Sequence, residues 1–183
     1  MTKVKDFSEL EIRNGEVRIR KNLGPLEELL AELQKPRSLN IAATTNAIIE
    51  KVQLGDREGL IGKKALLLKL VKDPRPEVRR IALWALARTA DFGDVPLFMK
   101  SLDDPNIDVV VEGHNALCFL SRNPQGFGLP ASPLEGVPEE ATQSQRLEAV
   151  KKWRAEVRKR WKAWYLKVRP YEERNDIEDV RKR

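Results

Sequence analysis

The residue types that most often carry chemistry are scarce in this chain, and two of them lie close together. The 183 residues include one histidine and one cysteine, His114 and Cys118. A spacing of four places both side chains on one face of a helix. Zinc needs three or four such ligands, and a histidine-based triad needs further partners, so neither site can be completed from these residue types. We therefore expect no catalytic residue, no metal, no cofactor and no small-molecule substrate, and we expect Cys118 to lie in the core.

Acidic pairs occur just before several expected helices. Asp91 and Asp94 form one group, and Asp103, Asp104 and Asp108 form another. Carboxylates at helix N-termini are favoured by capping and by the helix dipole. We interpret both groups as caps of helices and not as catalytic acids.

Basic and aromatic residues are combined near the C-terminus. The formal net charge is +6, but the segment 146–169 alone has ten Lys or Arg residues against Glu148 and Glu156. Three of the four tryptophans lie there too. This composition is typical of proteins that bind phosphates and stack on bases. The other interpretation is that the tryptophans are buried and that the cations form a solvated outer face.

Spacing by three and four favours the second interpretation. A long helix over about 139–169 would carry a continuous apolar stripe, made of Leu147, Val150, Trp153, Val157, Trp161, Trp164 and Val168. The opposite side then presents a candidate contact ridge for nucleic acid, a membrane surface or an acidic protein. This ridge consists of Lys151, Arg154, Arg158, Lys162 and Tyr165.

The element that must position this helix is a repeat in residues 64–120. Two helical hairpins follow each other there, and their Asp73-Pro74 and Asp104-Pro105 turns are 31 residues apart. At that offset apolar or small residues coincide, for example Ala82 with Gly113. A helical repeat with a period in the thirties predicts an α-solenoid, in which each hairpin buries its apolar face against its neighbour.

The first copy resembles the HEAT repeat, in which an apolar helix is followed by Asp-Pro, Val-Arg and an Ala-rich helix. Here the pattern is Asp73-Pro74, then Val78-Arg79, then a helix containing Ala82 and Ala85. The second copy departs from it, with Val110 in place of the Arg. The resemblance implies an all-α fold and a generic binding or scaffolding role. HEAT-like repeats also occur in DNA-repair glycosylases, which implies nucleic acid as an alternative partner.

The N-terminal part adds a hairpin and a third repeat. Alternating residues around Asn14-Gly15 predict a β-hairpin with a type I′ turn, and residues 25–55 fit a degenerate first repeat. The apolar face of the hairpin either covers the end of the solenoid or binds a partner by adding a strand to its sheet. The candidate partner-binding residues on this face are Leu10, Ile12, Val17 and Ile19.

Composition sets the remaining expectations. Apolar residues make up 41% and charged residues 34% of the chain, and no apolar run approaches the roughly 20 residues that span a bilayer. A single cysteine cannot form an internal disulfide, which favours a reducing, cytoplasmic location. Residues 121–138 hold four prolines and three glycines, which predicts an irregular but ordered loop that packs back on the domain.

The sequence therefore predicts an all-α protein: a short α-solenoid of HEAT-like hairpins with an N-terminal β-hairpin and a long C-terminal helix. Its predicted function is a non-catalytic protein–protein interaction module, an adaptor or a structural subunit of a larger assembly. The alternative is a nucleic-acid-binding protein that uses the basic C-terminal helix. The predicted segments are the arm 1–22, the repeats 23–120, the loop 121–138, the helix 139–170 and the charged tail 171–183.

Overall fold

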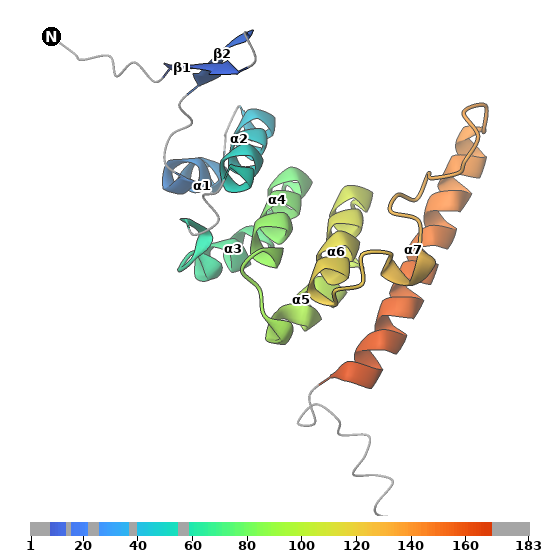
Figure 1. The fold of residues 1–183 in the computed structure, drawn as a ribbon. Helices are drawn as coiled ribbons and strands as arrows, with labels where there is room; N and C mark the ends of the chain where they lie inside the picture. Colours follow the sequence, from blue (N-terminus) through green and yellow to red (C-terminus); the bar gives the residue numbers. More distant parts are fainter. Residues whose placement is uncertain (1–7, 14–15, 22–25, 37–39, 55–58, 170–183) are drawn as a thin grey trace, which may run out of the picture. The chain divides into compact units, whose positions relative to one another are not determined.

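The structure is a computed structural model that describes residues 8–13, 16–21, 26–36, 40–54 and 59–169. The chain divides into two compact units, Met1–Thr89 and Ala90–Arg183. Helices make up most of the described part of each unit (Figure 1). The all-α prediction is therefore confirmed.

The first unit contains two helical hairpins. Helix α1 packs against α2, α3 packs against α4, and α2 also packs against α4. The expected degenerate repeat therefore stacks on the first complete one. These helices are α1 (Leu26–Gln34), α2 (Ile41–Gln53), α3 (Lys64–Leu70) and α4 (Pro76–Ala87).

The Asp-Pro turn between α3 and α4 is held by two arginines. The Asp73 carboxylate accepts hydrogen bonds from Nε and Nη2 of Arg75, at 2.7 and 2.8 Å. Hydrogen bonding to Arg75 lowers the pKa of Asp73 below its usual value. Nη1 of Arg79 donates to the carbonyl oxygens of Asp73 and Pro74, both at 2.9 Å. The Asp and the Arg of the repeat pattern thus both satisfy polar groups of this turn.

Arg75 also links the two hairpins of the first unit. Its guanidinium donates to the backbone oxygens of Leu33 at 2.6 Å and Lys35 at 2.8 Å, at the C-terminal end of α1. The last carbonyls of a helix have no partner within the helix. One side chain therefore joins the Asp73 carboxylate to the end of a helix about 40 residues earlier in the chain.

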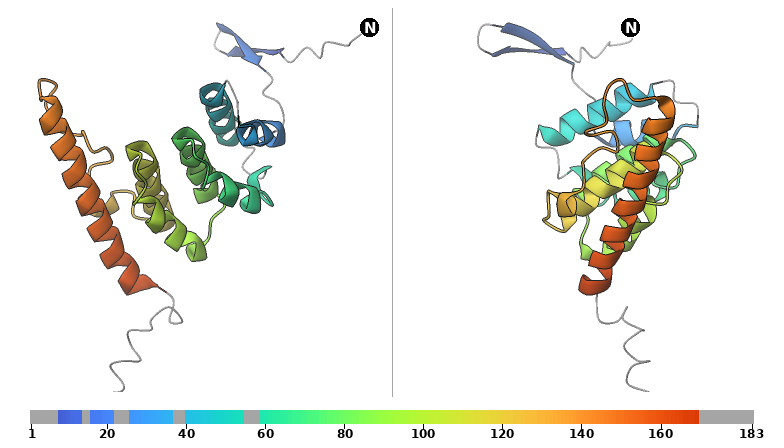
Figure 2. Two further views of the ribbon diagram at one scale, coloured as in Figure 1. Left: turned by 180° about the vertical axis from the view of Figure 1, so that it is seen from behind. Right: turned by 90° about the vertical axis from the view of Figure 1, so that its right-hand side faces the viewer.

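The second unit contains the third hairpin of the chain, which is the second complete repeat, and the long helix. Helix α5 packs against α6, and α7 packs against both α5 and α6; Figure 2 shows α7 running beside α6. The elements are η2 (Phe92–Asp94), α5 (Val95–Ser101), α6 (Ile107–Leu120), η3 (Gly126–Gly128) and α7 (Gln143–Val168).

Two substitutions of the repeat pattern have clear causes in the second unit. Val110, in the place of Arg79, is fully buried, so an arginine there would need partners for its charge. Gly113, in the place of Ala82, faces Ser101: a Cβ added at Gly113 would lie 1.9 Å from the Ser101 Oγ. The glycine therefore allows α5 and α6 to approach closely.

The N-terminal strands β1 (Ser8–Arg13) and β2 (Glu16–Lys21) are antiparallel, with Leu10 opposite Ile19 and Ile12 opposite Val17. The Asn14-Gly15 turn lies outside the described residues, as do the side chains of both strands. The hairpin and its apolar face therefore stay a prediction.

Candidate functional site

Helix α7 begins with a capping box. Thr142 accepts a hydrogen bond from the Gln145 amide, and the Gln145 side chain accepts one from the Thr142 amide. With 26 residues α7 is about 39 Å long, whereas the 14 residues of α6 span about 21 Å. The first turns of α7 are exposed, and Leu147, which we expected on the buried stripe, is 62% exposed. The prediction for Leu147 was wrong because α5 and α6 are too short to cover all of α7.

The middle of the apolar stripe is buried as predicted. Trp153 is 6% exposed and Trp161 is fully buried. Trp164 is only half-buried and makes edge-to-face contacts with Phe92 and Trp161. The two buried indoles are therefore part of the core of the second unit and are not free to stack on a ligand.

The single histidine is the hydrogen-bond partner of one buried tryptophan. Trp161 Nε1–H donates to Nδ1 of His114 over 2.8 Å. Since Nδ1 accepts, the hydrogen of the neutral imidazole is on Nε2. Burial lowers the pKa of His114, because the charged form is poorly solvated in this position. His114 is thus a structural acceptor, a role that the spacing of His114 and Cys118 alone did not suggest.

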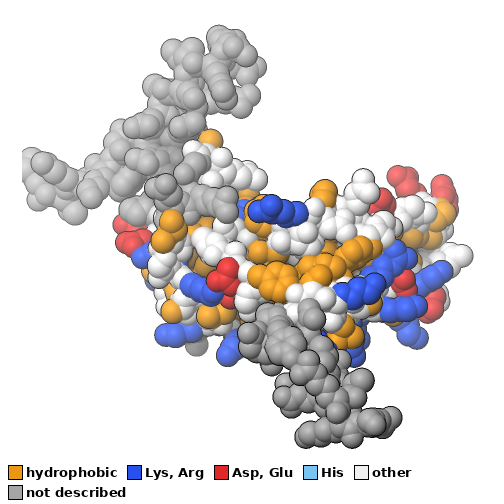
Figure 3. Space-filling model, turned by 60° about the horizontal axis from the view of Figure 1, so that its bottom comes forward, with side chains coloured by type: hydrophobic (Ala, Val, Ile, Leu, Met, Phe, Trp, Pro, Cys, Tyr) orange, Lys and Arg blue, Asp and Glu red, His pale blue; other side chains and the backbone are white. Residues whose placement is uncertain are grey.

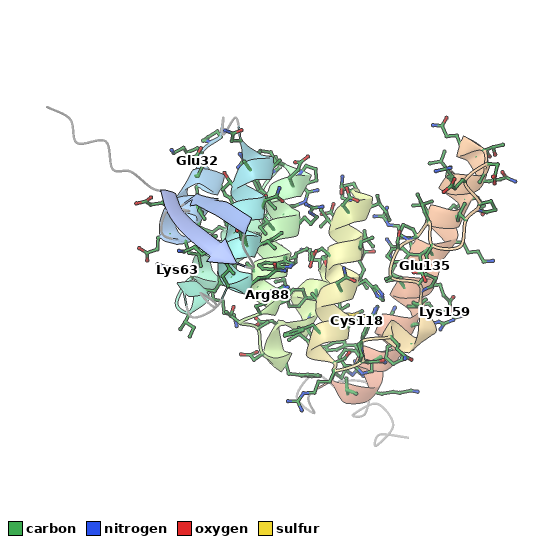
Figure 4. All side chains as sticks on the ribbon, turned by 45° about the horizontal axis from the view of Figure 1, so that its top comes forward. Glu32, Lys63, Arg88, Cys118, Glu135 and Lys159 are labelled. Carbon is green, nitrogen blue, oxygen red and sulfur yellow. The ribbon has the colours of Figure 1, made fainter. Side chains whose placement is uncertain are left out.

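Cys118 is half-buried and not fully in the core as expected. Its Sγ lies 3.7 Å from Nε2 of His114, and Figure 4 shows it on α6. Burial raises the pKa of its thiol to about 11, so the thiolate that would bind a metal or attack a substrate is rare at neutral pH. Within the described ranges no group of three or more His, Cys, Asp or Glu residues could hold a metal ion.

The Pro- and Gly-rich loop is attached to α7 through its backbone. Trp153 Nε1–H donates to the Pro130 oxygen at 2.8 Å, and the Arg160 guanidinium donates to the Phe127 oxygen at 2.5 Å. Gly126 lies against α6 with a positive φ of 49°, and a Cβ there would lie 2.6 Å from Cε1 of His114. The expected packing of this loop on the domain is therefore confirmed.

A pocket of about 370 Å³ lies between this loop and the C-terminal half of α6. Its lining is mostly apolar, with polar contributions from His114, Asn115 and Arg122. The remaining lining residues are Cys118, Phe119, Pro124, Leu129 and Ala131. Sequence reasoning missed this pocket, because its walls are brought together by contacts such as the Trp153–Pro130 hydrogen bond, which joins residues 23 positions apart.

The predicted contact ridge is only partly exposed. Lys151 and Lys162 are exposed, whereas Arg154 and Tyr165 are half-buried. Arg158 pairs with Asp103 at 2.6 Å and donates to the Leu102 oxygen at 3.5 Å, at the end of α5. Arg158 thus contacts the turn whose own repeat arginine is replaced by Val110. Whether the ridge binds anything stays a prediction.

Four exposed lysines of α7 form a face that overlaps the predicted ridge at Lys151 and Lys162. We define the outer lysine face as Lys151, Lys152, Lys159 and Lys162, all exposed. Within the described part of the chain, Lys151, Lys152 and Lys162 have no ion pair or side-chain hydrogen bond, and Lys159 has only a charge interaction with Glu156. In Figure 3, Lys and Arg side chains gather with some Asp and Glu toward the right-hand side of the view.

One of the two acidic groups caps a helix. Asp91 and Asp94 form a capping box at the start of η2. The Asp104 carboxylate accepts a hydrogen bond from the Asn106 amide in the turn before α6. The capping interpretation is confirmed for Asp91 and Asp94, whereas Asp104 stabilises a turn, and Asn106 caps α6 itself.

Comparison with protein families agrees with the geometry of the first unit. The family model described as HEAT repeat matches residues 65–92, which include α3, the Asp73 turn and α4. This match supports the predicted HEAT-like helical repeat. HEAT repeats generally mediate protein–protein interaction or scaffolding, and as a family they are generally non-catalytic.

Comparisons with curated proteins and with solved structures do not extend this result. No curated protein and no solved structure matches the chain. None of the helices in the described ranges combines the length and apolar character needed to cross a membrane.

Proposed function

We propose that this protein is a non-catalytic protein–protein interaction module, acting as an adaptor or as a structural subunit of a larger assembly. The class supports a protein partner, since HEAT repeats generally bind proteins. The observation that carries the proposal is the outer lysine face: Lys151, Lys152 and Lys162 are exposed on one helix, and within the described residues none of them has an ion pair.

The chemistry of α7 favours an acidic protein surface over nucleic acid. Single-stranded nucleic acids bind through aromatic rings on which bases stack. Trp153 and Trp161 are buried and hydrogen-bonded inside the unit, so they cannot serve as stacking platforms. Nucleic-acid binding through the cations alone is the second candidate, and its signature would be a steep loss of affinity with salt.

A charge-reversal experiment tests the proposal. We expect the tagged full chain, purified from its native host, to bring down a partner in stoichiometric amount, identified by mass spectrometry. The triple variant K151E/K159E/K162E should lose that partner. The matched control K69E/K72E/K100E makes the same change in net charge at exposed lysines of α3, the following turn and α5, and should retain it. Equal capture by both variants, or no partner at all, would contradict the proposal.

A salt titration separates the two candidates. If the second candidate holds, the chain binds a generic duplex or single-stranded DNA at low salt, and the logarithm of the affinity falls linearly with the logarithm of salt concentration. The lysine-face variant should then lose this binding. We expect instead that fluorescence anisotropy detects no such binding at about 50 mM salt, a low concentration at which contacts with phosphate groups are strong.

The predicted N-terminal hairpin and the cellular location complete the proposal. The predicted hairpin face with Leu10, Ile12, Val17 and Ile19 would serve as a second contact, adding a strand to the sheet of a partner. We place the module in the cytoplasm, in keeping with a single cysteine that cannot form an internal disulfide.

A further inference from the structure

The loop that forms one wall of the pocket is attached to α7 by hydrogen bonds. Its loop wall, at Leu129 and Ala131, flanks the Pro130 oxygen that Trp153 holds at 2.8 Å. Its helix wall carries Phe119, which is 55% exposed. The apolar surface therefore continues from the pocket out to the mouth, as expected where a segment of another protein lies across the surface and inserts one side chain.

Arg122, at this mouth, occupies a backbone position that normally belongs to glycine. Its amide donates to the Phe119 oxygen and the Asn123 amide donates to the Cys118 oxygen, which is the Schellman arrangement at the end of α6. Arg122 is the left-handed residue of this motif, with φ of 55°. A non-glycine residue is strained there, and such strain is often found at ligand-binding positions. A cation at any position of the last turn interacts favourably with the helix dipole. The dipole therefore does not explain why an arginine occupies this particular position.

The charge of Arg122 has no acidic partner in the described part of the chain. The single acidic residue of the loop, Glu135, accepts a hydrogen bond from the Ala131 amide. The Cys118 thiol is neutral, and the neighbouring Asn115 is exposed and uncharged. The mouth therefore offers one unpaired guanidinium beside an apolar pocket. A guanidinium forms its strongest contacts with carboxylates.

We propose that this pocket is a docking site for a protein segment in which an apolar side chain stands next to an acidic residue. The apolar side chain enters the pocket, and the carboxylate pairs with Arg122. This inference rests on the proposed function as an interaction module and names the chemistry of one contact on the partner.

Short peptides test the proposal on the full chain. Acetyl-Gly-Leu-Glu-Gly-amide and acetyl-Gly-Glu-Leu-Gly-amide are titrated into the ¹⁵N-labelled protein. At least one should shift the amide signals of Asn115, Phe119, Arg122 and Leu129 in a saturable way. Replacing Glu by Gln, or Leu by Ala, in the same peptide should each weaken binding by about tenfold, the expected effect of losing one charge-assisted or apolar contact.

Two variants at one position separate binding from folding. R122G relieves the left-handed strain and should raise Tm by about 3–5 °C, while it weakens peptide binding about tenfold. R122Q keeps the strain and removes the charge, so it should weaken binding equally without raising Tm. Filling the pocket with A131W should abolish binding of the Leu-containing peptides.

Several results would overturn the proposal. These are no saturable shift with either peptide, unchanged affinity in R122G and R122Q, or tighter binding of octanoate than of both peptides, which would indicate a small-molecule site. If the peptides fail but a partner that depends on the lysine face still copurifies, the pocket proposal is wrong and the proposed function stands. If the peptides bind but no partner copurifies, the adaptor or subunit role is wrong, and the pocket remains a peptide-binding site.

Discussion

Nδ1 of His114 holds the hydrogen bond from Trp161, and it is also the atom that a second proton would occupy. Protonation would remove that bond and place a charge among Trp153, Trp161 and Cys118. The pKa of His114 is therefore lower in the folded chain than the ordinary value of about 6.5 in the unfolded chain. The unfolded state binds more protons below that pH, and so acid favours unfolding.

We expect the free energy of unfolding of the second unit to be constant above about pH 7.5 and to fall as pH drops below about 6.5, by up to about 1.4 kcal/mol per pH unit. Urea unfolding followed by tryptophan fluorescence between pH 5 and 8 measures this. The variant H114Q retains an acceptor for Trp161 and has no titrating ring, so its stability should be flat over the same range. An equal slope in both proteins would rule out His114 as its source.

A substitution at Gly126 tests how closely the loop packs against His114. Gly126→Ala should lower the stability by about 2–4 kcal/mol, because a Cβ would lie 2.6 Å from the His114 ring in addition to the left-handed strain. Gly128 has φ of 72° and nothing within 4 Å of its added Cβ. Gly128→Ala should therefore cost only about 1 kcal/mol from strain. Thermal unfolding of the two variants gives the comparison, and similar losses would contradict the close contact.

At the scale of the elements, the Asp73 turn is stabilised by an arginine that reaches a different hairpin. Arg75→Ala would leave the Asp73 carboxylate and the oxygens of Leu33 and Lys35 without this donor. We expect a loss of about 2 kcal/mol, since the group is partly buried and charged. Arg80→Ala, at an exposed position of α4, should change the stability by less than about 0.5 kcal/mol. Chemical denaturation of both variants decides whether Arg75 has this role.

The helices of this protein could be predicted because their causes are local. The Asp73-Pro74 and Asp104-Pro105 turns and the four-residue spacing of Trp153, Val157 and Trp161 are each set by residues that are close in the sequence. The sequence pattern predicts these helices at 65–71, 77–89, 95–102 and 108–120, and the ends of α3 to α6 lie within two residues of those positions.

The partners of individual side chains could not be predicted in the same way. The bond from Trp153 to Pro130 spans 23 residues, and the contact of Arg158 with Leu102 spans 56. Nothing in the local pattern marks such pairs. The predicted ridge included Arg154 and Arg158 because helical spacing alone cannot show how far α5 and α6 extend over α7. The left-handed Arg122 was missed because arginine is not a residue that normally signals this conformation.

At the scale of the whole molecule, each unit has a core of its own, and that of the second unit is completed by α7. Trp161→Ala should lower its stability by about 3–5 kcal/mol, because a fully buried indole and its bond to His114 are lost. Trp164→Ala removes a half-buried ring and should cost clearly less. Amide hydrogen exchange of α5, α6 and α7 measures the effect in this unit separately. Equal protection in the two variants would mean that α7 does not close the core.

The neutral state of Cys118 has a practical consequence for work with the protein. With a pKa of about 11, about one thiol in ten thousand is ionised at pH 7. Air oxidation proceeds through the thiolate, so a disulfide between the Cys118 residues of two molecules forms slowly. A purified preparation should therefore stay free of cross-linked dimers during storage without dithiothreitol, and bands on a non-reducing gel should remain at the monomer mass.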